Sequence, residues 1–316
     1  MEKRKLGRSG IETAPLTFGG NVFGWTADTD TSCKLIDAFL AGGFDFIDTA
    51  DVYSRWAPGN QGGESELAIG EWIRRGGARS KVKIATKVGM NFSPERGGLK
   101  KDYVIKSCED SLKRLKTDYI DLYQSHRDDE TVPLHETLEA YAELIKQGKV
   151  RAIGASNYGP KRLALALEVS RKQGLPRYES LQPHYNLCER KLYEGELEDL
   201  CRKEDLGVIG YYSLASGFLT GKYRSEADAE GKPRGAGVKK YMNDRGFGIV
   251  ETLRAVASET KSTPTQVALA WLIARPGVTA PIVSATSVKQ LEEVLGAADV
   301  KLDAGQIARL DAASAT

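Results

Sequence analysis

The 316-residue sequence lacks the features that mark several protein classes. No apolar run approaches the roughly 20 residues of a membrane-spanning helix, and none follows the charged first five residues as in a signal peptide. Lys and Arg number 45 against 43 for Asp and Glu, a formal net charge of only +2. We therefore expect no membrane and no nucleic-acid partner.

Cysteine and histidine are also scarce. Four cysteines are scattered through the chain without a Cys-x-x-Cys pair, which is typical of a protein from the reducing cytoplasm. The three histidines and the cysteines offer no ligand pairs at zinc spacing, so no metal site is predicted. No Gly-x-Gly-x-x-Gly follows a strand, which excludes the usual Rossmann fingerprint.

Strand-like and helix-like segments alternate along the whole chain. The predicted strands cover residues 15–19, 44–47, 82–86, 120–124, 150–154, 180–182, 208–212 and 280–283. Apolar spacing, Pro and Gly predict helices over residues 31–40, 102–115, 133–147 and 161–173. Eight such units are the number that closes a (β/α)8 barrel, and no linker divides the chain. We therefore expect one TIM-barrel domain over residues 1–316.

Three segments fall outside this alternation. Residues 3–13 carry Gly7-Arg8-Ser9-Gly10 between short alternating runs, which predicts a β-hairpin across the bottom of the barrel. Residues 223–246 are polar and glycine-rich, which is typical of a mobile loop and suggests a lid. Residues 303–313 predict an extra C-terminal helix capped by Asp303.

Polar side chains with complementary chemistry follow the second, third and fourth predicted strands. They are Asp48, Tyr53, Lys87 and His126. In an eight-stranded barrel the carboxyl ends of the strands meet at one face, where catalytic groups lie. A phenol has a pKa of about 10, and a nearby ammonium favours its anion. We therefore predict Tyr53 as a general acid, Lys87 as its pKa depressor, Asp48 as the counter-ion and His126 as a hydrogen-bonding group for a substrate oxygen.

Each of these residues alone has an ordinary interpretation. An Asp after a strand is most often a cap, a loop Tyr or Lys is usually surface, and a lone His is usually structural. A chemical alternative also exists, in which Lys87 is the nucleophile of a Schiff-base aldolase. The joint position of the four residues at strand ends favours the acid–base interpretation.

The same segments resemble the aldo-keto reductase family over almost the whole chain. The resemblance rests on residues 46–53, 85–88, 124–129, 154–158 and 181–187. Residues 211–223 are similar to the long-loop bacterial members and to potassium-channel β subunits. The resemblance implies a barrel that holds an extended nicotinamide dinucleotide across its top.

The resemblance also implies a set of cofactor-binding residues. Ser156, Asn157 and Gln182 would bind the carboxamide, and Tyr211 would stack on the nicotinamide ring. The pyrophosphate would lie against Ser213, Leu214, Ala215, Gly217, Leu219, Gly221 and Lys222, and the adenosine end against Ser284, Thr286, Ser287, Gln290 and Glu293. Ser284 replaces a usual Gly, Val294 a usual Asn, and Gln290 the Arg of many NADP users. NADP(H) is expected, with NAD(H) as the alternative.

Two tryptophans complete the predicted site. Trp25 and Trp56 follow the first and second strands, where large aromatic side chains often line substrate pockets. The favoured function is an NADP(H)-dependent oxidoreductase that reduces an aldehyde or ketone. A nicotinamide-binding regulatory subunit of the channel-β type remains the alternative, and the sequence does not indicate the substrate.

Overall fold

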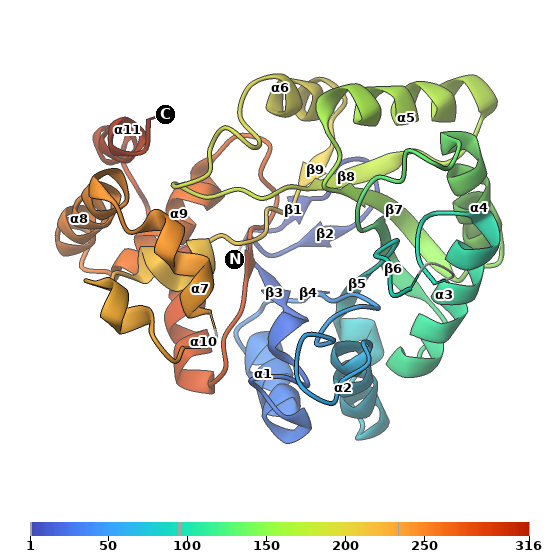
Figure 1. Cartoon of the computed structure of the whole chain (residues 1–316), viewed down its shortest axis with the longest axis horizontal. Coiled ribbons are helices and arrows are strands. Elements are labelled where there is room, and N and C mark those ends of the chain that lie inside the picture. Colours follow the sequence, from blue (N-terminus) through green and yellow to red (C-terminus); the bar gives the residue numbers. More distant parts are fainter. Residues whose placement is uncertain (1, 94–95, 233, 316) are drawn as a thin grey trace.

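Eight parallel strands form the central sheet of the computed structural model, which describes residues 2–93, 96–232 and 234–315 (Figure 1). Along the sheet the strands are ordered β10-β3-β4-β5-β6-β7-β8-β9. Their bounds are β3 Thr17–Gly19, β4 Phe46–Asp48, β5 Lys83–Val88, β6 Ile120–Ser125, β7 Val150–Ser156, β8 Tyr178–Gln182, β9 Gly207–Val208 and β10 Ile282–Val283. The eight predicted strands are confirmed, although their ends shift by a few residues.

The sheet curls so that its first and last strands meet. Thr279 N donates to Val208 O at 2.8 Å, and Ile282 N donates to Gly210 O at 2.8 Å. These bonds link the ends of the sheet across β9 and β10, so the predicted (β/α)8 architecture is confirmed. The predicted strand over 208–212 was too long, because the regular ladder with β8 ends at Val208.

Helices surround the sheet, and the predicted ones are present with small differences. They are α1 Thr29–Ala41, α2 Glu64–Arg74, α3 Lys101–Leu115, α4 Leu134–Lys146, α5 Pro160–Gln173, α6 Glu196–Lys203, α7 Gly235–Val238, α8 Asp244–Glu259, α9 Pro264–Ala274, α10 Val288–Leu295 and α11 Ala304–Ala313. Pro133 precedes α4 rather than opening its first turn, because its ψ of 132° is extended. Asp303 caps α11 by accepting from Gln306 N, as predicted.

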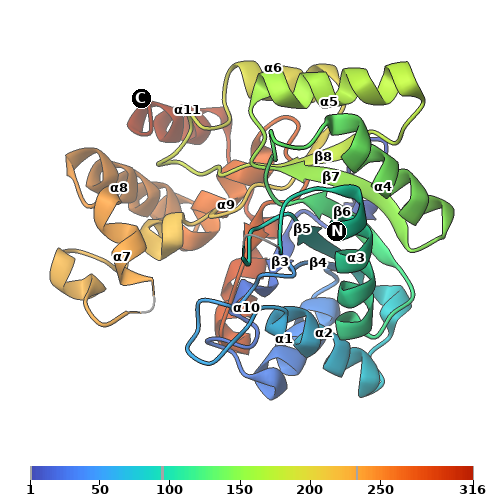
Figure 2. The same cartoon turned by 45° about the vertical axis from the view of Figure 1, so that its right-hand side comes forward.

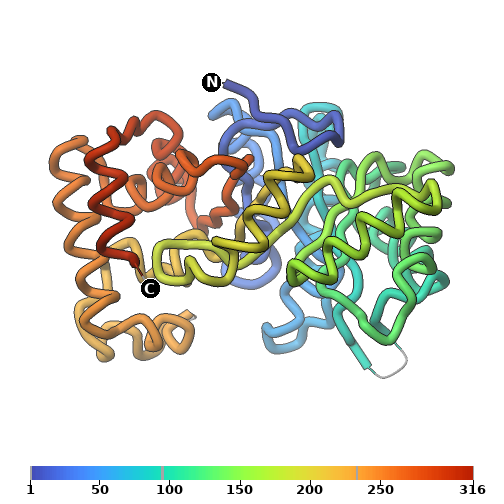
Figure 3. The backbone as a smooth tube through the Cα atoms, turned by 90° about the horizontal axis from the view of Figure 1, so that it is seen from above, coloured from blue at the N-terminus to red at the C-terminus, as the bar shows by residue number. Residues whose placement is uncertain are grey.

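The N-terminal hairpin closes one end of the barrel. Strands β1 Arg4–Lys5 and β2 Glu12–Thr13 pair antiparallel, and Leu6 and Ile11 between them are buried. Both side chains pack in one apolar cluster with barrel-interior residues: Phe46, Ala85, Leu122, Ala152, Ile209 and Ala280. Figure 3 shows the hairpin at one end of the molecule and the loops that follow the strands at the other end. The predicted position of the hairpin is therefore correct.

The segment 223–246 is more structured than its composition predicts. It holds three short helical pieces, η4 Glu226–Ala229, α7 and η5 Lys239–Tyr241, and its last residues begin α8 (Figure 2). Ala229, Val238 and Tyr241 are buried and anchor these turns to the core. Its predicted mobility stays a prediction, and residue 233 lies outside the described residues. Within the described chain, every helix is too short or too polar to cross a membrane.

Candidate active site

Four side chains meet at the carboxyl ends of β4, β5 and β6. Asp48 ends β4, Tyr53 lies five residues later, Lys87 lies in β5, and His126 follows β6. Lys87 Nζ donates to Asp48 Oδ2 at 2.7 Å and to Tyr53 Oη at 2.9 Å. The His126 and Tyr53 rings pack edge to face, with centroids 5.9 Å apart. The structure therefore brings the four predicted residues together.

Lys87 is held by a complete set of acceptors. Its side chain is 0% exposed, and Nζ also donates to Thr49 O at 2.7 Å. A lysine ammonium has three N–H donors, so Asp48, Thr49 and Tyr53 use all of them. Burial lowers the pKa of Lys87, and the charge of Asp48 opposes this shift. An enclosed, fully bonded amine offers no open path for a carbonyl, which argues against the aldolase alternative.

The pKa of Tyr53 departs from the expectation drawn from the sequence. Burial and then the charge of Asp48 raise the pKa of Tyr53 well above its ordinary value. The net shift is upward because the phenolate would lie next to a carboxylate in a poorly hydrated place, and the lowering contributed by Lys87 stays a prediction. Tyr53 Oη accepts from Lys87 and lies 3.2 Å from Asp48 Oδ2, so the phenol keeps its proton at neutral pH.

His126 is an uncharged group in this site. Burial, followed by the charges of Lys87 and Arg127, lowers the pKa of His126 well below its ordinary value. Its Nδ1 is buried and has no hydrogen-bond partner among the described residues. A neutral imidazole carries one N–H donor, which suits a hydrogen bond to a neutral polar group such as a carbonyl.

A pair of glutamines holds the second oxygen of Asp48. Gln182 Nε2 donates to Asp48 Oδ1 at 2.9 Å, and Gln124 Nε2 lies 3.3 Å from the same oxygen. Gln124 was missed in the sequence, although it precedes Ser125-His126 and pairs in register with Lys87. The two amides orient the carboxylate so that its other oxygen faces Lys87.

The predicted nicotinamide-binding residues form a second connected group. Tyr211 Oη donates to Asn157 Oδ1 at 2.8 Å, and Asn157 Nδ2 reaches Ser156 Oγ at 3.1 Å. Ser156 Oγ donates to Gln182 O at 2.9 Å, which joins this group to the side of the site that holds Asp48. Asn157 adopts a left-handed φ of 57° that turns its amide toward Tyr211. All four residues predicted to hold the nicotinamide are therefore close to the catalytic group.

The two predicted pocket tryptophans lie together beside Tyr53. The Trp25 and Trp56 rings are 5.7 Å apart and nearly perpendicular, and Trp56 lies 5.9 Å from the Tyr53 ring. Trp56 is 49% exposed. A large, half-exposed aromatic side chain next to the predicted acid is suited to contact a substrate. The substrate role of Trp25 and Trp56 stays a prediction.

The predicted pyrophosphate segment is tightly wound. Ala215, Ser216 and Gly217 have consecutive left-handed φ angles of 48°, 60° and 97°. Ser213 Oγ donates to Ile282 O at 2.7 Å, which ties the segment to β10. The side chains of Ala215 and Leu219 are buried, so only their backbone could contact a ligand. Leu214, Gly221 and Lys222 lie in the same turns. The N–H groups of Ala215, Gly217, Leu219 and Gly221 already donate to backbone oxygens within these turns, so the pyrophosphate role of the segment stays a prediction.

Arg234 is a residue that sequence reasoning missed. It comes from the long segment and donates through Nη2 to the amide oxygen of Asn21 at 3.0 Å, in the amide orientation that also lets Asn21 donate to Ser284 Oγ at 2.7 Å. No described carboxylate pairs with Arg234, and burial lowers its pKa. Burial, then the charge of Arg234, also lowers the pKa of Lys222. Two cations without a carboxylate between them suit the phosphates of a dinucleotide.

The predicted adenosine-end residues lie around the start of α10. Ser287 caps the helix by accepting from Gln290 N, and Gln290 Oε1 accepts from Thr286 N and Thr286 Oγ1 at 3.0 and 2.9 Å. Glu293, one turn on, accepts from Thr263 Oγ1 at 3.2 Å. The Gln290 side chain is therefore bonded to Thr286 at the start of α10. An arginine at this position would place a charged guanidinium there.

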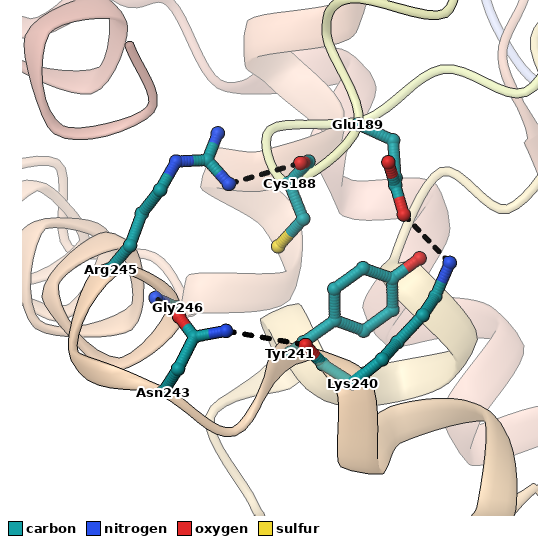
Figure 4. Close-up of a pocket in the computed structure, with 7 residues that line it drawn as sticks. All are labelled: Cys188, Glu189, Lys240, Tyr241, Asn243, Arg245 and Gly246. Carbon is teal, nitrogen blue, oxygen red and sulfur yellow. Dashed lines mark hydrogen bonds and ion pairs between the residues drawn. The ribbon is translucent and has the colours of Figure 1, made fainter. Parts of the chain in front are cut away.

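A separate cavity of about 190 Å³ lies next to the segment that follows β8 (Figure 4). Glu189 and Lys240 form an ion pair of 2.7 Å at its rim, and Arg245 Nη1 donates to Cys188 O at 3.1 Å. Its lining residues are Cys188, Glu189, Lys240, Tyr241, Asn243, Arg245 and Gly246. None of them belongs to the predicted catalytic or cofactor set.

Comparisons with known proteins agree with this geometry. Residues 15–315 match the profile described as the aldo/keto reductase family. The chain is 35% identical over 311 residues to YrpG, an oxidoreductase of Bacillus subtilis (strain 168), covering 96% of this chain and 93% of the relative. It is 32% identical to a probable voltage-gated potassium channel subunit beta of rice (Oryza sativa subsp. japonica; 95% and 92% covered) and 29% identical to L-glyceraldehyde 3-phosphate reductase of Escherichia coli (strain K12; 93% and 86% covered). The chain therefore belongs to the aldo/keto reductase family.

Proposed function

We propose that this protein reduces an aldehyde or ketone to an alcohol with NADP(H), and that Tyr53 is the general acid. The observation that carries the proposal is the contact of Tyr53 Oη with Lys87 Nζ at 2.9 Å, within a site that also holds a neutral His126. A protonated phenol that lies against a buried ammonium can release its proton when negative charge develops next to it.

The chain's own residues each have a task in this proposal. The substrate carbonyl oxygen accepts hydrogen bonds from Tyr53 and His126, which orient it. As negative charge develops on that oxygen, Tyr53 donates its proton, and Lys87 stabilises the phenolate that remains. Asp48 keeps the ammonium in place through its bond of 2.7 Å. Acid help of this kind is typically worth about 10²–10⁴ in rate.

The residues that would hold the dinucleotide fit its chemistry. Tyr211 supplies an aromatic surface next to Asn157 and Ser156, and Gln182 keeps Oε1 free of any hydrogen bond to a described residue. Lys222 and Arg234 supply positive charge near the wound backbone of residues 213–222. A nicotinamide bound there would supply the hydride for the carbonyl carbon. Thr286, Ser287 and Lys289 at the start of α10 favour the 2′-phosphate of NADP(H).

The proposal is tested by measuring NADPH binding through fluorescence and then NADPH consumption with a panel of aldehydes. Saturable binding and turnover of at least one aldehyde are expected. A protein that binds NADPH but turns over none of the panel would favour a second function, a nicotinamide-binding regulatory subunit. The relative described as a probable potassium-channel subunit beta motivates that second candidate.

A further inference from the structure

His184 stacks on Tyr211, the residue proposed to carry the nicotinamide. The two ring centroids are 5.3 Å apart and the rings are inclined by 25°. Backbone bonds hold them next to each other: Tyr211 N donates to Pro183 O at 2.9 Å, and Tyr185 N donates to Tyr211 O at 3.2 Å. Because these backbone hydrogen bonds join the segment around His184 to Tyr211, the barrel backbone fixes the relative position of the two rings.

Asn186 determines which nitrogen of His184 carries the proton. Asn186 is fully buried, and its Oδ1 accepts from Cys188 N at 2.8 Å and from Glu189 N at 3.1 Å. Its Nδ2 must therefore be the donor on the other side, where it bonds Tyr212 O at 2.9 Å and faces His184 Nε2 at 3.3 Å. An amide N–H next to Nε2 requires a bare Nε2 there, so the proton lies on Nδ1.

The surroundings keep the His184 ring neutral. Burial lowers the pKa of His184 to about 4, with the charge of Glu189 opposing the shift and that of Lys240 adding to it. Glu189 and Lys240 neutralise each other as the ion pair shown in Figure 4. Tyr212 contacts the edge of the imidazole, with ring centroids 5.2 Å apart.

Tyr211 is also held at its hydroxyl. Asn157 Oδ1 accepts from Tyr211 Oη at 2.8 Å, while Asn157 Nδ2 donates to His126 O at 2.9 Å. The phenol is therefore fixed at its oxygen by Asn157 and across its ring by His184. This arrangement leaves little freedom to tilt, which matters because stacking energy depends on ring orientation.

We propose that His184 is a positioning residue for cofactor binding: its neutral ring, oriented by Asn186, supports Tyr211 and fixes the plane on which a nicotinamide stacks. The inference rests on the proposed function and adds to it a residue to which the resemblance assigns no role. It predicts that loss of the imidazole weakens binding of the nicotinamide half of the dinucleotide and leaves binding of the other half unchanged.

The test compares two ligands and two variants. NADPH and 2′-phospho-ADP-ribose, which lacks the nicotinamide, are titrated against the wild type, His184→Ala and His184→Phe. His184→Ala should bind NADPH about three- to tenfold more weakly, as expected for a lost aromatic contact, and His184→Phe should stay within about twofold of the wild type. All three proteins should bind the phospho-ADP-ribose within about twofold of one another.

Several results would overturn this inference. They are equal NADPH binding by His184→Ala and the wild type, an equal loss for both ligands, or a His184→Phe variant as weak as His184→Ala. Wild-type protein that binds neither ligand would instead overturn the proposed function, and this inference with it.

A second measurement needs no variant and no cofactor. The chain has only three histidines, so ¹⁵N NMR of their side chains is tractable. At pH 7 the His184 ring should carry its proton on Nδ1 and leave Nε2 bare. A proton on Nε2, or a charged ring at pH 7, would contradict the hydrogen bond from Asn186 on which the proposal depends.

Discussion

Lys87 Nζ lies 2.7 Å from Asp48 Oδ2 and 2.9 Å from Tyr53 Oη, so one buried ammonium is shared between a carboxylate and a phenol. The carboxylate is charged in the resting state, and the phenol becomes charged only as its proton leaves. Burial and Asp48 raise the pKa of Tyr53 in the resting state. Lys87 therefore matters most in the transition state, where stabilisation contributes directly to rate.

Replacing Lys87 by Met should lower carbonyl reduction at pH 7 by about 10² or more, because the Tyr53 phenolate loses the charged donor that contacts it. The apparent pKa of the acid in the profile of kcat/KM against pH should rise. Lys83→Met is a matched control, because Lys83 lies in the same strand but pairs with Asp45 at 2.6 Å. A Lys87→Met variant with the wild-type pH profile would remove Lys87 from the mechanism.

Asp51 should make stability fall as the pH rises. Asp51 is 3% exposed, and its Oδ1 has no hydrogen-bond partner in the described structure. Burial, followed by the charge of Glu66, raises the pKa of Asp51 to about 7. The folded state therefore binds more protons than the unfolded state between the unfolded pKa of about 4 and the folded value. Across that window the stability contributed by protonated Asp51 is lost at up to about 1.4 kcal/mol per pH unit.

Urea unfolding at pH 5 and pH 8 checks this prediction. Asp51→Asn should resemble the wild type at pH 5 and be more stable than it at pH 8. The exposed Asp118→Asn serves as the control. A wild-type difference between the two pH values that survives Asp51→Asn unchanged would show that another group titrates.

The segment 223–246 should become more protected when cofactor binds. Its described part is anchored by Ala229, Val238 and Tyr241, and Arg234 donates a hydrogen bond to Asn21. Hydrogen exchange of these amides should slow on adding NADPH, while exchange in α5 stays unchanged. Equal exchange with and without NADPH would leave the segment as an inert insertion.

NADPH should bind more tightly than NADH, by about tenfold to a hundredfold, and added salt should narrow the gap. Gln290→Arg should widen it, because Gln290 now bonds Thr286 and offers no cation. Gln173→Arg, at the exposed end of α5, is a control that adds the same charge outside the predicted site. Equal dissociation constants for the two nucleotides in the wild type would contradict the proposed 2′-phosphate site.

Strand-end chemistry made much of the site predictable. Asp48, Lys87 and His126 end or follow apolar runs, and a parallel barrel places the carboxyl ends of such strands at one face. The strand order was therefore enough to predict that the three side chains lie close together. Gln124 was missed although it lies two residues before His126, because a buried glutamine has no chemical pattern of its own. Arg234 could not be found, since its contact with Asn21 depends on how the long segment folds back.

Burial explains the other differences. The direction of the Tyr53 pKa shift depends first on the burial of its phenol and then on the charge of Asp48, and this burial is a result of tertiary packing that no local sequence pattern shows. The turns within residues 223–246 depend on three scattered apolar residues without helical periodicity. The regular ladder of β9 ends at Val208, and beyond it an isolated bridge joins His184 to Tyr211.

The most direct test of the account is Tyr53→Phe, which removes one hydroxyl and keeps the ring. Its kcat for an aldehyde that the wild type reduces should fall by about 10² or more, while its NADPH dissociation constant stays within about twofold. A Tyr53→Phe protein that keeps more than about a tenth of the wild-type kcat would contradict the assignment of Tyr53 as the general acid.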